Sequence, residues 1–135
     1  MKKIFILICL LILNSGCSAE SKEMSGTVID AETGEPIEDA VVLVEWTKTK
    51  GFGLTYTESY KVVEVVTDKE GKFKVSEVAD PFVNQPDIAI YKKGYVCWSN
   101  RIIFPDYRNR TDFTWQDQYV FKLEVFKPEY SYIKH

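Results

Sequence analysis

The sequence predicts an all-β protein, a seven-stranded β-sandwich that follows an N-terminal signal peptide. Three features of the 135 residues predict this fold class. Apolar residues recur at every second position, as they do in strands with one buried face. Glycine, proline and acidic turn residues separate these segments at short intervals, a spacing typical of sandwiches. An apolar repeat with the period of a helix is nearly absent along the chain.

The first residues have the pattern of an export signal. Lys2 and Lys3 are followed by an uninterrupted run of ten apolar residues, 4–13. A helix needs about 20 apolar residues to cross a bilayer, so this run is too short for a membrane span. A basic start followed by a short apolar core is instead typical of a cleaved signal peptide.

The residues after this apolar core, Leu13-Asn14-Ser15-Gly16-Cys17, resemble the lipobox of bacterial lipoproteins. The resemblance implies cleavage before Cys17 and acylation of this cysteine as the new N-terminus. Asn14 departs from the pattern, in which an aliphatic residue is usual. Ser18, where aspartate would favour the inner membrane, implies sorting to the outer membrane. The alternative is an ordinary secretory signal that is cut nearby, with Cys17 as an incidental thiol.

The predicted organisation is a single exported domain. It has a lipoprotein signal peptide over residues 1–16, a lipid-anchored tether over 17–25, a β-sandwich over 26–127 and a C-terminal tail over 128–135. Cleavage leaves 135 − 16 = 119 residues, enough for one ordinary domain.

Charge and cysteine content restrict the partners and the means of stabilisation. Cleavage removes two lysines, so the remaining chain has a charge of 15 − 20 = −5. Proteins that bind nucleic acid carry a basic footprint, so nucleic acid is not an expected partner. Cys97 is the one cysteine left after cleavage and acylation, so no internal disulfide can form. We expect Cys97 to be a small buried residue in a strand.

Seven segments of the domain alternate as strands do. In the second, Ala40, Val42, Val44 and Trp46 are expected to face inward. The segment 47–57 contains Gly51 and Gly53, so we expect a loop there. Asp68-Lys69-Glu70-Gly71 is a tight turn, which we expect to join the third and fourth strands as a hairpin. The predicted strands cover residues 24–30, 40–47, 58–67, 72–76, 88–91, 95–104 and 119–126.

Three motifs, taken in order, resemble the carboxypeptidase regulatory-like domain. The resemblance covers roughly residues 24–96 and implies a transthyretin-like (prealbumin-like) β-sandwich. It implies little chemistry, because this family is largely an accessory domain attached to peptidases, receptors and surface proteins. The motifs are Gly26-Thr27-Val28-Ile29-Asp30 with Thr33-Gly34-Glu35-Pro36-Ile37 and Ala40-Val41-Val42, then Thr67-Asp68 with Gly71, Phe73 and Val75, and finally Tyr91-Lys92-Lys93-Gly94-Tyr95.

The residue types that catalysis needs are scarce. The single histidine is His135, the last residue, whereas a nucleophilic serine or cysteine requires a base positioned beside it. A zinc site built from histidine and cysteine is excluded for the same reason. The Asp68–Gly71 turn is too short for a calcium loop of the EF-hand type. We therefore expect no enzymatic activity, no cofactor and no metal.

One segment, residues 104–119, is predicted to bind a ligand. It alternates aromatic residues with arginine and aspartate, a composition that suits a sugar or peptide surface. The alternative is that its rings pack over the end of the sandwich and its charges form a solvated rim. Phe52 and Tyr56 in the glycine-flanked loop are a second candidate of the same kind. The candidate ligand-binding residues in 104–119 are Tyr107, Arg108, Arg110, Asp112, Phe113 and Trp115.

These observations lead to three hypotheses about function. In the first, the chain is a non-catalytic envelope lipoprotein whose domain is an accessory or binding module, held at the outer membrane by lipid on Cys17. In the second, it binds a protein, peptide or carbohydrate ligand of the cell envelope through residues 104–119. A hydrolase is the least favoured of the three, because no base is available in the body of the domain.

Overall fold

The computed structural model describes residues 23–131 and 133, and within this part the chain is all-β without a helix. The predicted signal peptide 1–16, the lipidation site Cys17 and His135 lie outside the described residues. No helix in the described part is long and apolar enough to span a membrane. The strands are β1 (Glu23–Asp30), β2 (Val41–Lys50), β3 (Tyr56–Val66), β4 (Lys72–Ser76), β5 (Asp87–Tyr91), β6 (Trp98–Ser99), β7 (Ile102–Ile103), β8 (Arg108–Asn109) and β9 (Tyr119–Leu123).

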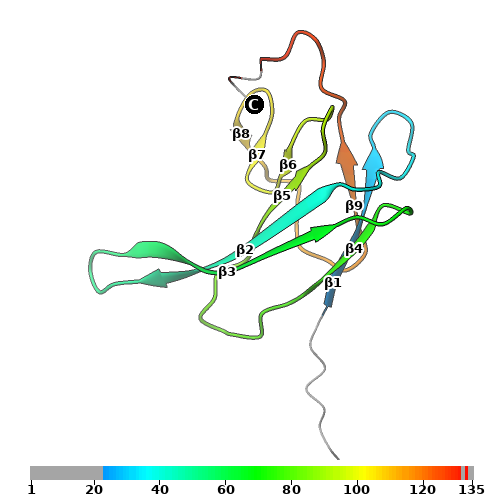
Figure 1. The fold of residues 1–135 in the computed structure, drawn as a ribbon. Coiled ribbons are helices and arrows are strands. Elements are labelled where there is room, and N and C mark those ends of the chain that lie inside the picture. Colours follow the sequence, from blue (N-terminus) through cyan, green and yellow to red (C-terminus); the bar gives the residue numbers. More distant parts are fainter. Residues whose placement is uncertain (1–22, 132, 134–135) are drawn as a thin grey trace, which may run out of the picture.

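The strands form two main layers and a small hairpin (Figure 1). One layer is a three-stranded sheet in the order β4-β1-β9, and the other is a four-stranded sheet in the order β3-β2-β5-β6. Strands β7 and β8 form a separate antiparallel pair. The β1–β9 pair is parallel, whereas the other pairs are antiparallel. Because both main sheets contribute side chains to one buried cluster, the architecture is that of a β-sandwich.

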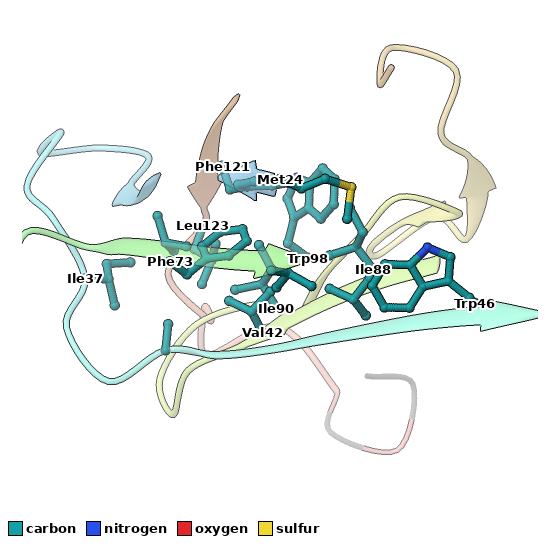
Figure 2. Close-up of a cluster of buried hydrophobic side chains, with 14 residues drawn as sticks. Met24, Ile37, Val42, Trp46, Phe73, Ile88, Ile90, Trp98, Phe121 and Leu123 are labelled. Atoms are coloured by element: carbon teal, nitrogen blue, oxygen red, sulfur yellow. The ribbon is translucent and has the colours of Figure 1, made fainter. Parts of the chain in front are cut away.

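The core forms because alternate residues of facing strands point inward (Figure 2). On β2 and just before it, Ala40, Val42 and Val44 are fully buried and Trp46 is 2% exposed, which confirms the predicted inward face. From the other sheet, the Phe121 ring lies 4.8 Å from the ring of Trp98, measured between centroids, in an edge-to-face contact. Such aromatic pairs contribute about 0.5–1.5 kcal/mol beyond the area that they bury.

Gly26 sits in the middle of β1 because two aromatic rings occupy the place of a side chain. A Cβ atom at this position would come within 2.6 Å of the Phe121 ring and 2.7 Å of the Phe73 ring. A glycine inside a strand often marks a site of close approach. Here it allows the rings of β4 and β9 to meet over β1, with 5.7 Å between their centroids.

The hairpin predicted between the third and fourth strands is wrong, although the turn itself is present. Asp68 Oδ1 accepts hydrogen bonds from the backbone N–H groups of Glu70 (3.0 Å) and Lys72 (2.8 Å). However, β3 pairs with β2 and β4 pairs with β1, so this turn carries the chain from one sheet to the other. Gly71 fixes the crossing, because its carbonyl accepts a bond from Val28 N at 2.7 Å, and a Cβ would lie 2.4 Å from the Val28 carbonyl oxygen.

The predicted loop 47–57 is also mostly strand. Residues 47–50 pair with residues 56–59 across a register shift that follows Trp46, so only residues 51–55 form the loop. The polar residues of this ribbon have no buried face and therefore lack the alternation that would have indicated strands. We call residues 47–59 the arm, because Figure 1 shows the β2–β3 ribbon projecting beyond the rest of the sandwich.

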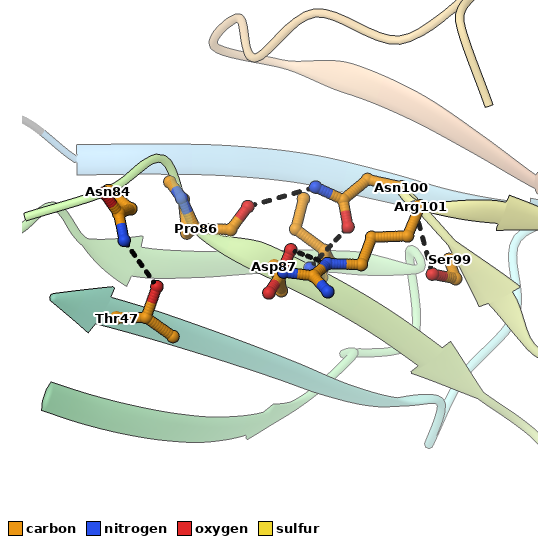
Figure 3. A network of polar contacts seen from close by, with 8 residues as sticks. Thr47, Asn84, Pro86, Asp87, Ser99, Asn100 and Arg101 are labelled. Atoms are coloured by element: carbon orange, nitrogen blue, oxygen red, sulfur yellow. Dashed lines mark hydrogen bonds and ion pairs between the residues drawn. The ribbon is translucent and has the colours of Figure 1, made fainter. Parts of the chain in front are cut away.

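The predicted strand 95–104 is broken into shorter pieces, which accounts in part for nine strands in the described residues where seven were predicted. At the break, the backbone N–H of Asn100 donates to the Ile88 carbonyl at 3.2 Å, and the side chain of Asn100 makes two further bonds to the backbone. Its Oδ1 accepts from Ile88 N at 2.8 Å, and its Nδ2 donates to the Pro86 carbonyl at 3.0 Å (Figure 3). The chain then turns into β7. The last strand ends at Leu123 instead of the predicted residue 126, and β1 begins at Glu23, inside the predicted tether.

One buried carboxylate connects the two sheets. Asp30, at the end of β1, accepts hydrogen bonds from the N–H groups of Glu32 (2.7 Å) and Thr33 (2.9 Å). It also accepts from the hydroxyl of Tyr95 (2.9 Å), which follows the turn after β5 of the other sheet. The N–H groups of Thr33 and Glu32, together with the Tyr95 hydroxyl, hold the pKa of Asp30 below its ordinary value of 3.8.

We predict that Asp30→Asn destabilises the fold in a pH-dependent way. Because the folded-state pKa of Asp30 is lowered, its contribution is fully present above 3.8 and is lost as the pH falls through the folded-state pKa. Thermal unfolding should therefore show a lower Tm for the variant than for wild type at pH 7, and this difference should shrink below pH 3.8. Tyr95→Phe, which leaves the backbone bonds intact, should lower Tm less. A Tm difference that is independent of pH would contradict this role.

Candidate binding surfaces

The structure divides the predicted binding segment 104–119 between the surface and the core. Tyr107 lies in the turn between β7 and β8 with a positive φ of 53° and is 47% exposed. Arg108 begins β8, with 69% of its side chain exposed and its Nε 4.0 Å from Asp106 Oδ2. These two side chains are therefore accessible on a small hairpin. Figure 1 places this hairpin at the end of the molecule opposite to the start of β1.

Phe113 and Trp115 instead pack over the end of the sandwich. Both are half-buried against the core cluster. The ring of Phe113 lies 5.2 Å from that of Trp98, 5.0 Å from that of Tyr119 and 5.7 Å from that of Trp115. This arrangement matches the alternative considered for these rings, in which they cover the core.

Arg110 holds the same segment in place. Only 13% of its side chain is exposed. Its guanidinium lies 4.6 Å from the Trp98 ring centroid, and its Nε donates to the Ser99 carbonyl at 2.7 Å. Its Nη1 lies 3.3 Å from Asp112 Oδ1. The charge of Arg110 is thus engaged with the domain, whereas that of Arg108 faces solvent.

Cys97 is half-buried just before β6 and not within a strand. Its Sγ lies 3.8 Å from the Trp98 carbonyl oxygen. Burial raises the pKa of the thiol, which favours the uncharged form. This environment suits the predicted role of Cys97 as a small packed residue.

The arm and the loop 77–86 carry exposed apolar side chains that the sequence indicated only in part. Phe52 is fully exposed and Tyr56 is 58% exposed. Leu54, 92% exposed, and Phe82, 82% exposed, were not predicted as surface residues of interest. The sequence feature that could have indicated their exposure is their position: Leu54 follows Gly53 and Phe82 follows Pro81, and side chains next to such turn residues are not expected to be buried.

A groove of about 770 Å³ is lined by residues of the edge strands β3 and β4 and of β1, with Asp68 and Gln118. Val65 and Phe73 contribute apolar lining, and Lys72 and Lys74 contribute charge. Sequence reasoning missed this groove because it exists only when β3 and β4 belong to different sheets.

Within residues 23–131 and 133, no three histidine, cysteine, aspartate or glutamate residues lie close enough together to hold a metal ion. In the Asp68–Gly71 turn, the Asp68 carboxylate accepts hydrogen bonds from its own turn. The chain matches no protein-family model, and no curated protein gives a significant match to its sequence.

We predict that Arg110 and Arg108 differ in their effect on stability. Arg110→Ala should lower the free energy of unfolding by about 2 kcal/mol, since it removes a cation–π contact and a charged hydrogen bond. Arg108→Ala is the matched control and should change it by less than about 0.5 kcal/mol, because the side chain is exposed. Urea unfolding measures both values. Equal effects of the two variants would show that Arg110 does not hold the segment.

Proposed function

We propose that this chain is a non-catalytic envelope lipoprotein whose β-sandwich is an accessory or binding module. The observation that carries this proposal is that its connected polar side chains stabilise the fold, whereas several aromatic side chains are exposed. The well-connected groups, Asp30, Thr67 and Arg110, hold backbone and rings of the fold. Accessible aromatic side chains, such as Phe52 and Tyr107, lie on hairpins outside the core. Surfaces of this kind suit binding.

The domain is proposed to be of the carboxypeptidase regulatory-like, transthyretin-like type. Support comes from the resembling motifs, each of which contains a glycine with a positive φ: Gly34 (75°), Gly71 (70°) and Gly94 (91°). Residues with a side chain rarely adopt this conformation, so each motif specifies a turn. The hydrogen bond between Asp30 and Tyr95 further joins the first motif to the last.

The proposed location is the outer membrane, with lipid on Cys17 as the anchor. Cys17 precedes β1 by 23 − 17 = 6 residues, which suits a short connection between lipid and domain. One acyl chain binds a membrane only marginally, whereas the several chains of a bacterial lipoprotein would hold it stably.

A second candidate function is the binding of a carbohydrate or peptide by the β7–β8 hairpin. The observation that favours it is the joint exposure of Tyr107 and Arg108 at one hairpin. An exposed ring covers an apolar sugar or peptide face, while the guanidinium binds hydroxyl or carboxylate groups. Phe113 and Trp115 would then support the hairpin and not contact the ligand.

Lipidation is tested by expressing the full chain in a Gram-negative host beside Cys17→Ser. The expected result is acyl mass on wild type, found with the membranes in fractionation, and no acyl mass on the variant. Intact mass spectrometry and fractionation make the measurement. Wild-type protein that is cleaved but unacylated and soluble would refute the anchor and leave a secreted domain.

The second function is tested with purified peptidoglycan, which presents both sugar and peptide. Tyr107→Ala should lower the affinity about tenfold, equivalent to 1.4 kcal/mol, in a co-sedimentation assay. Tyr91→Ala is the control, because Tyr91 is similarly exposed at 51% but lies on β5. Equal affinities for wild type and both variants would exclude the hairpin as the binding element.

A further inference from the structure

Apart from Ile133 near the C-terminus, which is 99% exposed, the most exposed large apolar side chains of the described residues occur on two neighbouring segments. Phe52 and Leu54, at the tip of the arm, are fully and 92% exposed, and Phe82 is 82% exposed in the loop that follows β4. By comparison, Val62, Val66 and Tyr91 on the sheet surface are only about half exposed. Single exposed apolar residues are common on proteins. Three such residues on two segments that are hydrogen-bonded to each other are better explained by an external apolar phase.

Hydrogen bonds hold the loop 77–86 against the base of the arm. Asn84 N donates to the Thr47 carbonyl at 2.8 Å, and its side-chain Nδ2 donates to Thr47 Oγ1 at 3.0 Å (Figure 3). Lys48 Nζ lies 2.8 Å from Asp80 Oδ2, on the same loop. Phe82 therefore sits on a segment whose position is fixed relative to the arm.

The loop 77–86 starts beside the first residue of β1. Ser76, the last residue of β4, pairs with Glu23, the first residue of β1, and the loop follows directly. Figure 1 shows the start of β1, the loop after β4 and the arm in the lower part of the view, with the β7–β8 hairpin in the upper part. From Cys17 to Glu23 an extended chain reaches at most about 20 Å, so lipid on Cys17 keeps this end of the sandwich near the bilayer.

We propose that this end of the domain rests on the lipid bilayer, with Phe52, Leu54 and Phe82 in the membrane interface. This inference rests on the proposed lipid anchor. It goes further, because it assigns a membrane-contacting surface to the folded domain itself. The consequence is a fixed orientation: the arm lies along the membrane and the β7–β8 hairpin points away from it, toward soluble ligands.

The charges of this end favour a neutral lipid surface. Lys50 pairs with Glu58 across the arm, and Lys48 pairs with Asp80, so neither lysine depends on anionic lipid for a partner. Attachment then comes from burial of the exposed rings and the leucine at the boundary of head groups and acyl chains. We expect vesicles of phosphatidylcholine alone to be sufficient, with little dependence on salt.

The experiment uses the full-length lipidated protein reconstituted in phosphatidylcholine vesicles, with or without bromine on the acyl chains. Phe52→Trp reports on the arm, and Tyr107→Trp on the opposite hairpin is the matched control. Brominated lipid should quench the native tryptophans little, because Trp46 and Trp98 are only 2% and 7% exposed and Trp115 is half-buried. Subtracting wild-type emission isolates the added tryptophan, and intact mass of the same samples reports on the lipid.

The proposal requires that brominated lipid quench most of the emission added at position 52 and little of that added at position 107. Acylated protein with no quenching at position 52, or with equal quenching at both positions, overturns the membrane contact while the anchor stands. A shift of the Phe52→Trp emission with protein concentration in detergent would show that a second copy covers the arm, and this also overturns it. Protein without acyl mass refutes the anchor, and with it this inference.

Discussion

The carboxylate of Asp30 makes the connection on which the two-layer arrangement depends. It ends β1 in one sheet, orders the turn that follows through the N–H groups of Glu32 and Thr33, and accepts the hydroxyl of Tyr95 from the segment after β5 in the other sheet. Thr67 acts similarly at the end of β3: its hydroxyl donates to the Ile37 carbonyl at 2.6 Å and accepts from Ala40 N at 2.8 Å. Both groups are buried, so their bonds form in a medium that strengthens them. A domain with no disulfide in its described part is thus closed at this end by polar contacts over an aromatic core.

Local patterns predicted the parts of the fold that are decided locally. The inward face from Ala40 to Trp46 could be read because one side of β2 is buried from its start to Trp46. The turns at Gly34, Gly71 and Gly94 could be read because each requires a positive φ. The sequence could not show which sheet each strand joins. The alternation of apolar residues in β3 and β4 is the same whether these strands pair with each other or with β2 and β1. The strand broken at Asn100 depends on contacts with Pro86 and Ile88, residues distant in sequence.

The candidate site shows the same division between composition and tertiary contacts. Its aromatic and charged residues were found from composition alone. Their accessibility depends on contacts with the core. The ring of Phe113 packs against Trp98 and Phe121, and the guanidinium of Arg110 lies over the Trp98 ring, so these two side chains are not free to bind a ligand. Tyr107 has no such neighbour in the core, and its ring lies 6.1 Å from that of Phe104. The arm was underestimated for a related reason, because a ribbon without a buried face resembles a loop in sequence.

The domain is therefore a sandwich that presents two projecting elements, the arm at the end near the start of β1 and the β7–β8 hairpin at the other end. Native-state hydrogen exchange tests this division most directly, because amide protection reports the opening of each element separately. We expect the slowest exchange in β1, β2 up to Trp46, β5 and β9, and much faster exchange in the arm and the β7–β8 hairpin. Protection of the arm equal to that of the central strands would contradict the account, since it would make the arm part of the cooperative core.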